Sequence, residues 1–400
     1  MITYLYMDPR TNPYAPGAGT VPPQLAGRDE IIEKVSIQLD RCRNGLAFRS
    51  FILVGLRGVG KTVLLNHLSL EAESNNFITV SIETPEKRSL PALLIPNLRA
   101  ALLKLDRLAA AGDSAKKALK ALGGFVGAMK LKYDDVEFGF DLGSLPGVAD
   151  SGNLENDLVS LFVEIGVAAK EKKTALVLFI DEVQYIAEEQ FASLIMALHR
   201  CTQKQLPVTI IGAGLPQLVG QAGRAKSYAE RLFEYPEVGP LSKKASTEAL
   251  VLPAKKENVD FEEGALIEIL EKTKGYPYFL QEWGKHCWQC ATVSPITTND
   301  AKYATSLAIN ELDESFFRVR FDRLTPTEKK YLRAMAELGP GPHRSGDIAN
   351  LMQREVQSVA PVRATLINKG MIYSPDHGDN SFTVPLFDEY MKRKIPNQID

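Results

Sequence analysis

A glycine-rich turn separates two ordered stretches near the start of the chain, in the octapeptide GLRGVGKT. Its spacing fits the pattern G-x-x-x-x-G-K-[ST] through Gly55, Gly60, Lys61 and Thr62. Glycines let successive backbone N–H groups curl around an anion, and the helix expected over residues 63–70 points its positive N-terminus at the same place. The pattern predicts a phosphate-binding loop, in which Lys61 reaches the outer phosphates and the Thr62 hydroxyl ligates Mg²⁺. The alternative is a chance glycine turn between a strand and a helix.

Two carboxylates follow an apolar stretch in the segment LVLFIDEVQ. Such a stretch indicates a buried parallel strand, and α/β sheets bind ligands beyond the carboxyl ends of their strands. Asp181 is placed to hold Mg²⁺ through water, and Glu182 to orient and polarise an attacking water. Alone, the pair is equally a solvated acidic turn. Together with the upstream loop, it predicts the second half of a nucleotide site.

The composition sets wider bounds on function. The chain has 400 residues, 45% of them hydrophobic, and a net charge of -2, so any nucleic-acid contact must come from a local patch. The start of the chain lacks signal-peptide features, and no apolar run is long enough to indicate a membrane span. We therefore expect a cytoplasmic protein with no membrane contact. Cys287 and Cys290 form one C-x-x-C, too few ligands for a tetrahedral zinc site, which favours buried core cysteines.

Apolar strands and helical patterns alternate through the first half of the chain. This rhythm predicts an α/β fold with a doubly wound parallel sheet. It breaks at about residues 109–153, where the alternating piece AMKLKYDDVEFGFDL indicates a β-hairpin within an insertion. Only helical patterns occur from residue 242 to about residue 323. Three short helices and an extended pair follow.

Several motifs occur in the order found in one group of proteins. The segments GRDEII, GLRGVGKT, LVLFIDE, AERLFEYPEVGPLS and KGYPYFL, with the C-terminal pattern, resemble the archaeal-type P-loop ATPases that lie between origin-recognition-like AAA+ proteins and STAND switch ATPases. The resemblance covers roughly residues 25–392. It implies ATP and Mg²⁺ as cofactors and ATPase activity. The domains it implies are an N-terminal arm at 1–24, a P-loop ATPase domain at 25–241, an all-helical lid at 242–323 and a winged-helix domain at 324–400.

The same resemblance assigns further residues to the nucleotide. Gly27 and Arg28 are expected near the adenine and ribose, and Pro277 of the G-x-P element at the start of a helix that faces the nucleotide. Arg231 corresponds to an arginine presented to a neighbouring subunit's γ-phosphate, where its fork neutralises charge in the transition state. The plain alternatives are helix capping for Pro277 and a surface position for Arg231. The expected loop contacts are completed by Arg57, Gly58 and Val63.

Two departures from the group concern hydrolysis. AAA+ proteins usually carry a polar residue at the end of the fourth strand, where this chain has Ala213 and Gly214. Replicative members carry an arginine at the start of the lid helix, where this chain has Tyr276 and Tyr278. Both departures favour a slow switch over a motor.

The C-terminal module has two possible kinds of partner. Apolar residues of the recognition-type helix would pack inward and leave Arg363 and Lys369 outside. Together with Arg354 and His377, these residues would form a patch that contacts double-stranded DNA. The charge of the module is nearly balanced, however, whereas DNA-binding domains present a clustered basic face. Three functions therefore stay open: a DNA-binding ATP switch, a signalling or defence switch that acts on a separate effector protein, and a nucleotide-binding scaffold. We expect ATP-dependent homo-oligomers if Arg231 acts in trans.

Overall fold

The computed structural model describes residues 7–17, 19–85, 87–107, 113–136, 143–376 and 378–396. Its centre is a sheet of five strands in the order β2-β3-β4-β1-β5, all parallel. This arrangement confirms the predicted α/β class and parallel sheet. The strands are β1 (Ser50–Val54), β2 (Ile78–Glu83), β3 (Leu176–Asp181), β4 (Val208–Gly214) and β5 (Phe233–Glu234).

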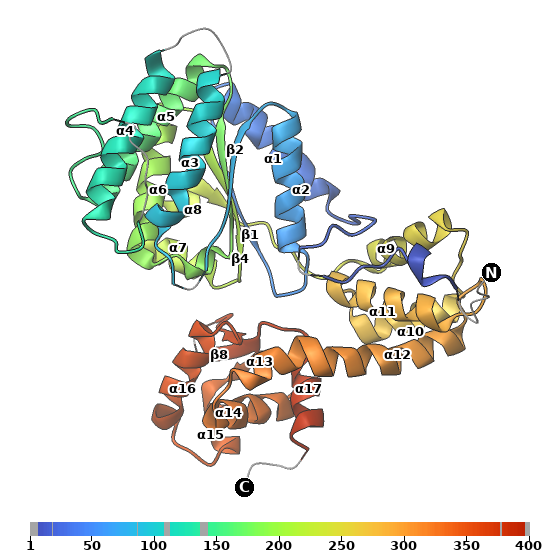
Figure 1. Ribbon diagram of the computed structural model, residues 1–400. Coiled ribbons are helices and arrows are strands. Elements are labelled where there is room, and N and C mark those ends of the chain that lie inside the picture. Colours follow the sequence, from blue (N-terminus) through green and yellow to red (C-terminus); the bar gives the residue numbers. More distant parts are fainter. Residues whose placement is uncertain are drawn as a thin grey trace.

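Helices cover both faces of this sheet (Figure 1). One face packs against α1 and α2, and the other against a stack that includes α3, α5 and α6. The central strands β1, β3 and β4 are buried along their whole length, as a parallel sheet covered on both sides requires. The helices of this region are α1 (Asp29–Arg43), α2 (Lys61–Ser74), α3 (Leu90–Arg107), α4 (Asp113–Lys130), α5 (Leu154–Glu171), α6 (Glu188–Gln203), α7 (Leu218–Ala225) and α8 (Ala229–Leu232), with a 3₁₀ turn η2 (Val183–Tyr185).

The insertion contains a helix where the sequence suggested a hairpin. The first residues of this piece, 128–130, belong to α4, and residues 131–136 form turns, so the hairpin prediction is wrong for this part. Phe125 and Met129, one turn apart on α4, are fully buried, and the helix packs between α3 and α5. The buried apolar face of this helix stabilises the helical conformation more than the short apolar–polar alternation after it favours strands. The rest of the expected hairpin, residues 137–142, lies outside the described residues.

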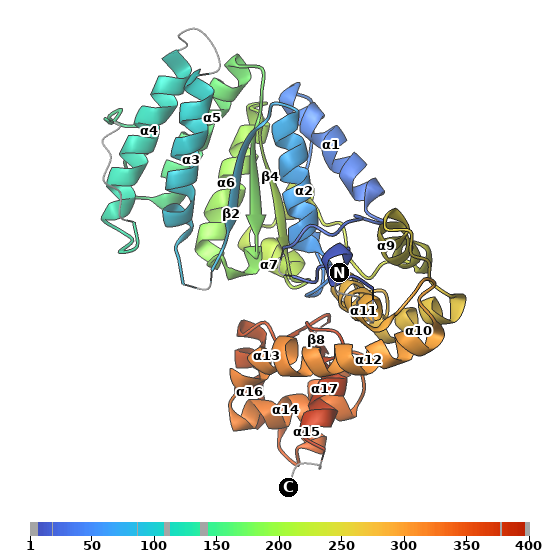
Figure 2. The ribbon, with the colours of Figure 1, turned by 45° about the vertical axis from the view of Figure 1, so that its right-hand side comes forward.

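The segment from residue 242 to residue 323 consists of helices and the loops that join them, in agreement with the predicted helical pattern, with one isolated β-bridge between Phe261 and Ile296. Its last part is one continuous rod, because α12 passes through a π-helical turn, η3, directly into α13 with helical backbone angles at both junctions. Figure 2 shows this rod running from the lid to the C-terminal segment. The elements are α9 (Lys243–Lys256), α10 (Glu263–Thr273), α11 (Pro277–Cys290), α12 (Thr298–Leu312), η3 (Asp313–Phe317) and α13 (Arg318–Asp322).

The C-terminal segment, residues 324–396, contains the three expected helices followed by the expected extended pair. A short strand, β6, and a final helix, α17, complete it and were not predicted; β6 extends the pair to an antiparallel sheet in the order β6-β8-β7. The elements are α14 (Pro326–Glu337), β6 (His343–Arg344), α15 (Ser345–Leu351), α16 (Val356–Asn368), β7 (Ile372–Tyr373), β8 (Asp379–Phe382) and α17 (Phe387–Lys394). Within the described ranges, every helix is too short or too polar to cross a bilayer.

Candidate functional site

The glycine-rich loop joins β1 to α2, which is the context that the phosphate-loop prediction required. Gly58 and Gly60 have φ angles of 81° and 87°, in the left-handed region that glycine enters without a steric penalty. Gly55 is required for a different reason: a Cβ at this position would collide with the carbonyl oxygen of Val238. Gly55 therefore seats the loop against the chain beyond β5, whereas Gly58 and Gly60 shape its turn.

Lys61 is folded back onto its own loop. Its Nζ donates to the carbonyl oxygens of Gly55, at 3.0 Å, and Leu56, at 2.8 Å. Burial lowers the pKa of Lys61 to about 8, although the charges of Asp181 and Glu182 oppose the shift. A carbonyl carries only part of a negative charge, so an anion entering the loop would be a stronger partner for this ammonium.

Asp181 meets Thr62 under the loop. The Thr62 hydroxyl donates to Asp181 Oδ2 at 2.6 Å, and Asp181 Oδ1 accepts the Glu182 N–H at 2.8 Å. Burial raises the pKa of Asp181, against the effect of both hydrogen bonds. A hydroxyl and a desolvated carboxylate side by side are the donor types that Mg²⁺ takes from proteins. The residues present therefore fit the predicted metal.

Glu182 occupies an unusual backbone conformation with φ of 54°. Such strain costs on the order of 1–3 kcal/mol in a non-glycine residue and persists only where neighbours enforce it. Thr84, just beyond the end of β2, donates its hydroxyl to the carbonyl oxygens of Asp181, at 2.8 Å, and Glu182, at 2.6 Å. Sequence analysis missed Thr84, although a polar residue at the carboxyl end of a parallel strand is a usable signal.

Two further side chains hold the Glu182 carboxylate. Gln184 donates its Nε2 to Glu182 Oε2, and its Oε1 accepts the N–H of Leu215 at 3.1 Å. Arg57 Nη1 lies 3.7 Å from Glu182 Oε1, and its Nη2 donates to the Tyr185 hydroxyl at 3.0 Å. Gln184 thus supplies a polar amide beside the end of β4, where Ala213 and Gly214 offer none. The sequence analysis did not assign Gln184.

A cavity of about 460 Å³ opens beside the loop. The predicted residues that line it are Arg28, Arg57, Gly58, Gly60, Lys61, Thr62, Val63, Pro277, Asp181 and Glu182. Arg28 is tied to the protein itself, because its Nη2 donates to the carbonyl oxygens of Val59, at 3.1 Å, and Gly239, at 2.6 Å. Gly27 and Gly55 are not among the lining residues. Gly27 instead lies against Ala245 of α9.

The N-terminal arm and the lid close the other sides of this cavity. Pro16, Gly17 and Thr20 of the arm line it, a role that sequence analysis missed. The arm is anchored on α11, where Trp288 Nε1 donates to the Asp8 carbonyl oxygen at 3.0 Å. The lid reaches the loop directly, because the Tyr278 N–H donates to the carbonyl oxygen of Gly58 at 3.2 Å.

Arg231 lies outside the cavity. It is exposed in α8, immediately before β5, and its side chain makes no hydrogen bond or ion pair with the residues that the structure describes. Ser50 pairs with Phe233, so Arg231 lies near the amino end of β1, whereas the loop follows its carboxyl end. The five residues of β1 span about 16 Å. Arg231 is therefore remote from the nucleotide site of its own chain.

The C-terminal segment touches the phosphate loop. The carbonyl oxygen of Thr383 accepts the Arg57 N–H at 2.9 Å. A Cβ added to Gly370 would lie 3.0 Å from Arg57 Nη2, 3.4 Å from the Tyr185 hydroxyl and 3.7 Å from Leu215 Cδ1. One small area of the C-terminal segment thus contacts the three loops that follow β1, β3 and β4.

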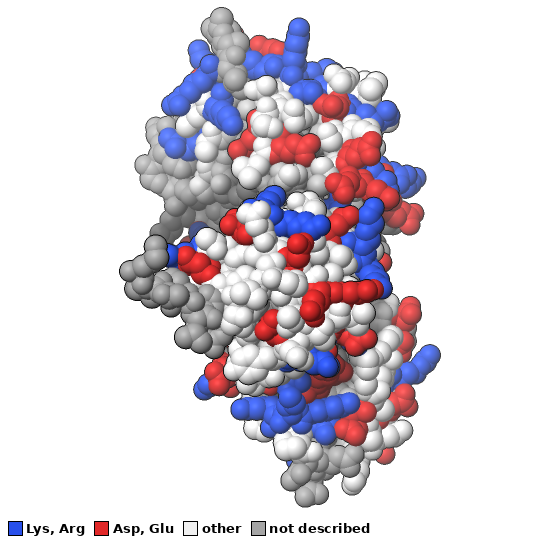
Figure 3. Space-filling view, turned by 90° about the vertical axis from the view of Figure 1, so that its right-hand side faces the viewer, with Lys and Arg blue, Asp and Glu red and all other residues white. Residues whose placement is uncertain are grey.

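Arg363 and Lys369, two of the residues expected to face DNA, are half-buried and bonded within the C-terminal segment. Arg363 donates to Asn380 Oδ1 at 2.6 Å and to the Ser374 hydroxyl at 2.8 Å, and so ties α16 to the sheet. Lys369 Nζ pairs with Glu328 at 2.8 Å. Arg354 is exposed, and His377 lies outside the described residues. On the face drawn in Figure 3, acidic and basic side chains are interspersed.

Comparisons with known proteins agree with this fold. Residues 24–211 match the family model described as an AAA ATPase domain, and residues 314–391 match a domain of unknown function, DUF8462. None of the curated proteins matches the chain. Residues 24–211 are therefore similar to an AAA ATPase domain, and the second match assigns no activity.

Solved structures with a similar fold include a Walker-type ATPase of Pyrococcus abyssi, at 18% identity and a TM-score of 0.58, over 92% of this chain and 96% of that chain. The RuvB Holliday junction branch migration motor of Thermotoga maritima has 15% identity and a TM-score of 0.45, over 96% of this chain and 100% of that chain. The Orc1 protein of Aeropyrum pernix, solved in complex with DNA, has 13% identity and a TM-score of 0.44, over 94% of both chains. The first of these shows the P-loop ATPase fold.

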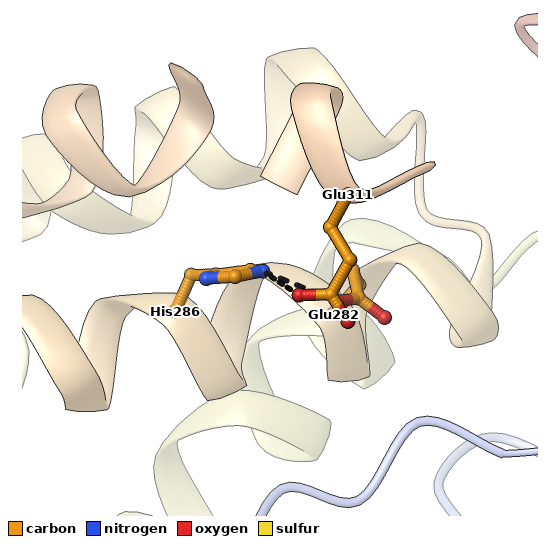
Figure 4. A group of neighbouring side chains, drawn as sticks. All are labelled: Glu282, His286 and Glu311. Carbon is orange, nitrogen blue, oxygen red and sulfur yellow. Dashed lines mark ion pairs between the residues drawn. The ribbon is translucent and has the colours of Figure 1, made fainter. Parts of the chain in front are cut away.

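A second polar cluster lies in the lid, between α11 and α12 (Figure 4). The ligand-type atoms of Glu282, His286 and Glu311 lie within 4.8 Å of one another. Lys285 already acts as their cation, with its Nζ 2.6 Å from Glu282 and 2.7 Å from Glu311. Burial acts to raise the pKa of Glu282, but hydrogen bonds with His286 and Lys285 lower it overall. The cluster is an ion network that fixes α11 to α12.

Removing the cation of this network should destabilise the lid. Lys285→Met leaves the Glu282 carboxylate, only 4% exposed, without its closest charge partner, so we expect a loss of about 3 kcal/mol in unfolding free energy. Lys244→Met is the control, because Lys244 is 89% exposed and 3.9 Å from Glu248, and it should change stability by less than about 0.5 kcal/mol. Urea unfolding measures both. Equal stability of the two variants would contradict the assignment of Lys285 as resident cation.

Proposed function

We propose that this chain is an Mg²⁺-dependent ATP-binding protein that hydrolyses ATP slowly and acts as a molecular switch. The observation that carries the proposal is the hydrogen bond of 2.6 Å between Thr62 and Asp181. It brings the Thr62 hydroxyl and the Asp181 carboxylate together beside the glycine-rich loop, which supports their assignment as metal ligands under bound phosphates. Glu182 adjoins them and lines the same cavity.

The residues would divide the work as follows. The loop N–H groups and Lys61 bind the phosphates, with Lys61 exchanging carbonyl partners for phosphate oxygens. Thr62 and Asp181 hold Mg²⁺, which when bound neutralises charge on the outer phosphates. Glu182 accepts a proton from the attacking water. Arg28 and the arm residues shape the side of the cavity where we place the adenine and ribose.

Slow turnover follows from how Glu182 is held. Its carboxylate already bonds Gln184 and pairs with Arg57, so it must release or share these partners to accept a proton. Ala213 and Gly214 provide no side-chain donor to help position the water. A switch needs a long-lived ATP state, and these features support one.

Replacing Glu182 should separate binding from hydrolysis. Glu182→Gln keeps the shape of the site but cannot accept the proton, so we expect ATP to bind as in the wild type and turnover to fall about a hundredfold or more. Lys61→Ala serves as the binding control and should abolish both. Isothermal calorimetry gives the affinity, and phosphate release gives the rate. Wild-type turnover in Glu182→Gln would show that Glu182 is not the base.

We further propose that the C-terminal segment folds as a winged helix and reports the nucleotide state to a protein partner. Gly370 and Thr383 rest on the loops that carry Arg57, Tyr185 and Leu215. A change in the position of any of these loops on ATP binding would therefore alter their contacts with the C-terminal segment. The internal bonds of Arg363 and Lys369 also favour a protein contact over DNA.

Crowding this contact should release the C-terminal segment. The backbone of Gly370 is left-handed, with φ of 62°, a conformation that asparagine can also adopt. In Gly370→Asn the new Cβ would lie 3.0 Å from Arg57 Nη2. We expect a larger radius of gyration by small-angle scattering and altered ATP turnover. The matched control is Gly378→Asn, whose φ is 86° and whose Cβ would meet nothing within 4 Å. Identical scattering for the two variants would argue against docking in solution.

We propose that Arg231 acts on the nucleotide of a neighbouring copy, because it is exposed and remote from its own loop. Turnover per chain should then rise with protein concentration, since a trans arginine contributes about 10³- to 10⁵-fold in other phosphoryl-transfer enzymes. Mixing Arg231→Ala with Lys61→Ala should restore part of the activity. Constant specific activity over a hundredfold dilution, with a monomer by light scattering in ATP, would exclude this arrangement.

A further inference from the structure

The π-helical turn η3 directs two consecutive aromatic residues in different directions. Phe317 is 1% exposed and stacks on Tyr390 of the C-terminal segment, with ring centroids 5.2 Å apart. Phe316 lines the nucleotide cavity and stacks on Tyr278 of the lid at 4.8 Å. The turn therefore joins the core of the C-terminal segment to the cavity, and π turns inside helices are frequent at functional sites.

Arg320 lies one turn further along the same rod and lines the same cavity. Its guanidinium carbon lies 4.0 Å above the Phe316 ring centroid, and its Nη1 donates to the Phe316 carbonyl oxygen. Among the described residues it forms no ion pair with a carboxylate, unlike Arg318, which pairs with Asp322 at 3.5 Å.

The surroundings of Arg320 disfavour its charge. Burial, assisted by the positive charge of Arg57, lowers the pKa of Arg320 to about 10. A partly buried cation that faces another cation costs free energy until an anion arrives. The cavity it faces is the one that the phosphate loop lines.

We propose that Arg320 binds the terminal phosphate of ATP within its own chain. This inference rests on the proposed ATP binding. Arg57, whose charge acts on Arg320, pairs with Glu182, which we place beside the reacting phosphate. Arg320 therefore belongs to the phosphate end of the cavity rather than to the arm end. A planar guanidinium suits two phosphate oxygens at once.

The position of Arg320 in α13 also connects the nucleotide cavity to the C-terminal segment. Arg320 is in α13, and Phe321 of the same helix packs in the core shared with the C-terminal segment. A phosphate that holds Arg320 therefore also holds the rod on which that segment sits. The terminal phosphate would be sensed in cis by the connector, in a chain whose lid helix starts with Tyr276 and Tyr278 instead of an arginine.

The test compares ATP with ADP. Affinities for a non-hydrolysable ATP analogue and for ADP, each with Mg²⁺, are measured by calorimetry in the wild type, Arg320→Ala, Arg320→Lys and Arg318→Ala. We expect Arg320→Ala to weaken binding of the ATP analogue at least about tenfold and that of ADP less than about threefold. Arg320→Lys should fall between, and Arg318→Ala, 63% exposed in the same helix, should match the wild type.

A second readout separates phosphate binding from a structural role. Without nucleotide, Arg320→Ala should unfold close to the wild-type temperature, because removing a cation that has no carboxylate partner offsets the loss of its contacts with Phe316. A structural arginine would lower the unfolding temperature when replaced. The ATP analogue should protect residues 313–324 from hydrogen exchange in the wild type but not in Arg320→Ala.

The outcomes also distinguish the two proposals. If the wild type binds neither nucleotide, the ATP proposal and this one both fall. If the wild type binds both and Arg320→Ala loses them equally, or loses neither, only the role of Arg320 is overturned. If Arg320→Ala does not fold, the same ratio measured in Arg320→Lys decides, and an unchanged preference for the ATP analogue overturns the inference.

Discussion

The hydrogen bond from Thr62 to Asp181 joins two strand ends that are not neighbours, because β4 lies between β1 and β3. The loop after β1 must therefore pass across the end of β4. It does so closely, with the Gly55 N–H donating to the Gly214 carbonyl oxygen at 3.1 Å. Small residues at the end of β4 leave room for Gln184. A Cβ added to Gly214 would collide with Gln184 Oε1. The positions of the glycine-rich loop, of Thr62 and Asp181, and of the Glu182 carboxylate all depend on this crossing.

Charge within the cavity is unbalanced in a way that prepares it for an anion. Lys61 bonds only carbonyl oxygens, and Arg320 bonds a carbonyl oxygen and an aromatic face. Arg57, in contrast, pairs with a carboxylate, that of Glu182. An entering polyphosphate would satisfy the first two cations and compete for the third. Freeing Glu182 from Arg57 would then be coupled to phosphate binding, which links occupancy of the site to its reactivity.

Three separate structures meet at the loop and could each transmit its state. The lid contacts Gly58 through Tyr278, the C-terminal segment contacts Arg57 through Thr383, and the arm lines the cavity from the far side. The ion network of Glu282, Lys285 and Glu311 links α11, which carries Tyr278, to α12, which continues into the π turn.

The sequence by itself determined the parallel sheet, the loop after β1 and the carboxylates after β3, because these depend on local spacing and on runs of apolar residues. Lys61, Thr62, Asp181 and Glu182, which the sequence motifs singled out, line one cavity. The secondary-structure prediction failed at the end of α4. There the last helical residues also begin an alternating pattern that is typical of a hairpin. Only the tertiary structure decided what Gln184, Thr84 and Arg320 contact, and that Arg363 and Lys369 are bonded within their own segment. Those roles arise from contacts between residues far apart in the chain, and no spacing in the sequence encodes which distant groups a side chain will meet.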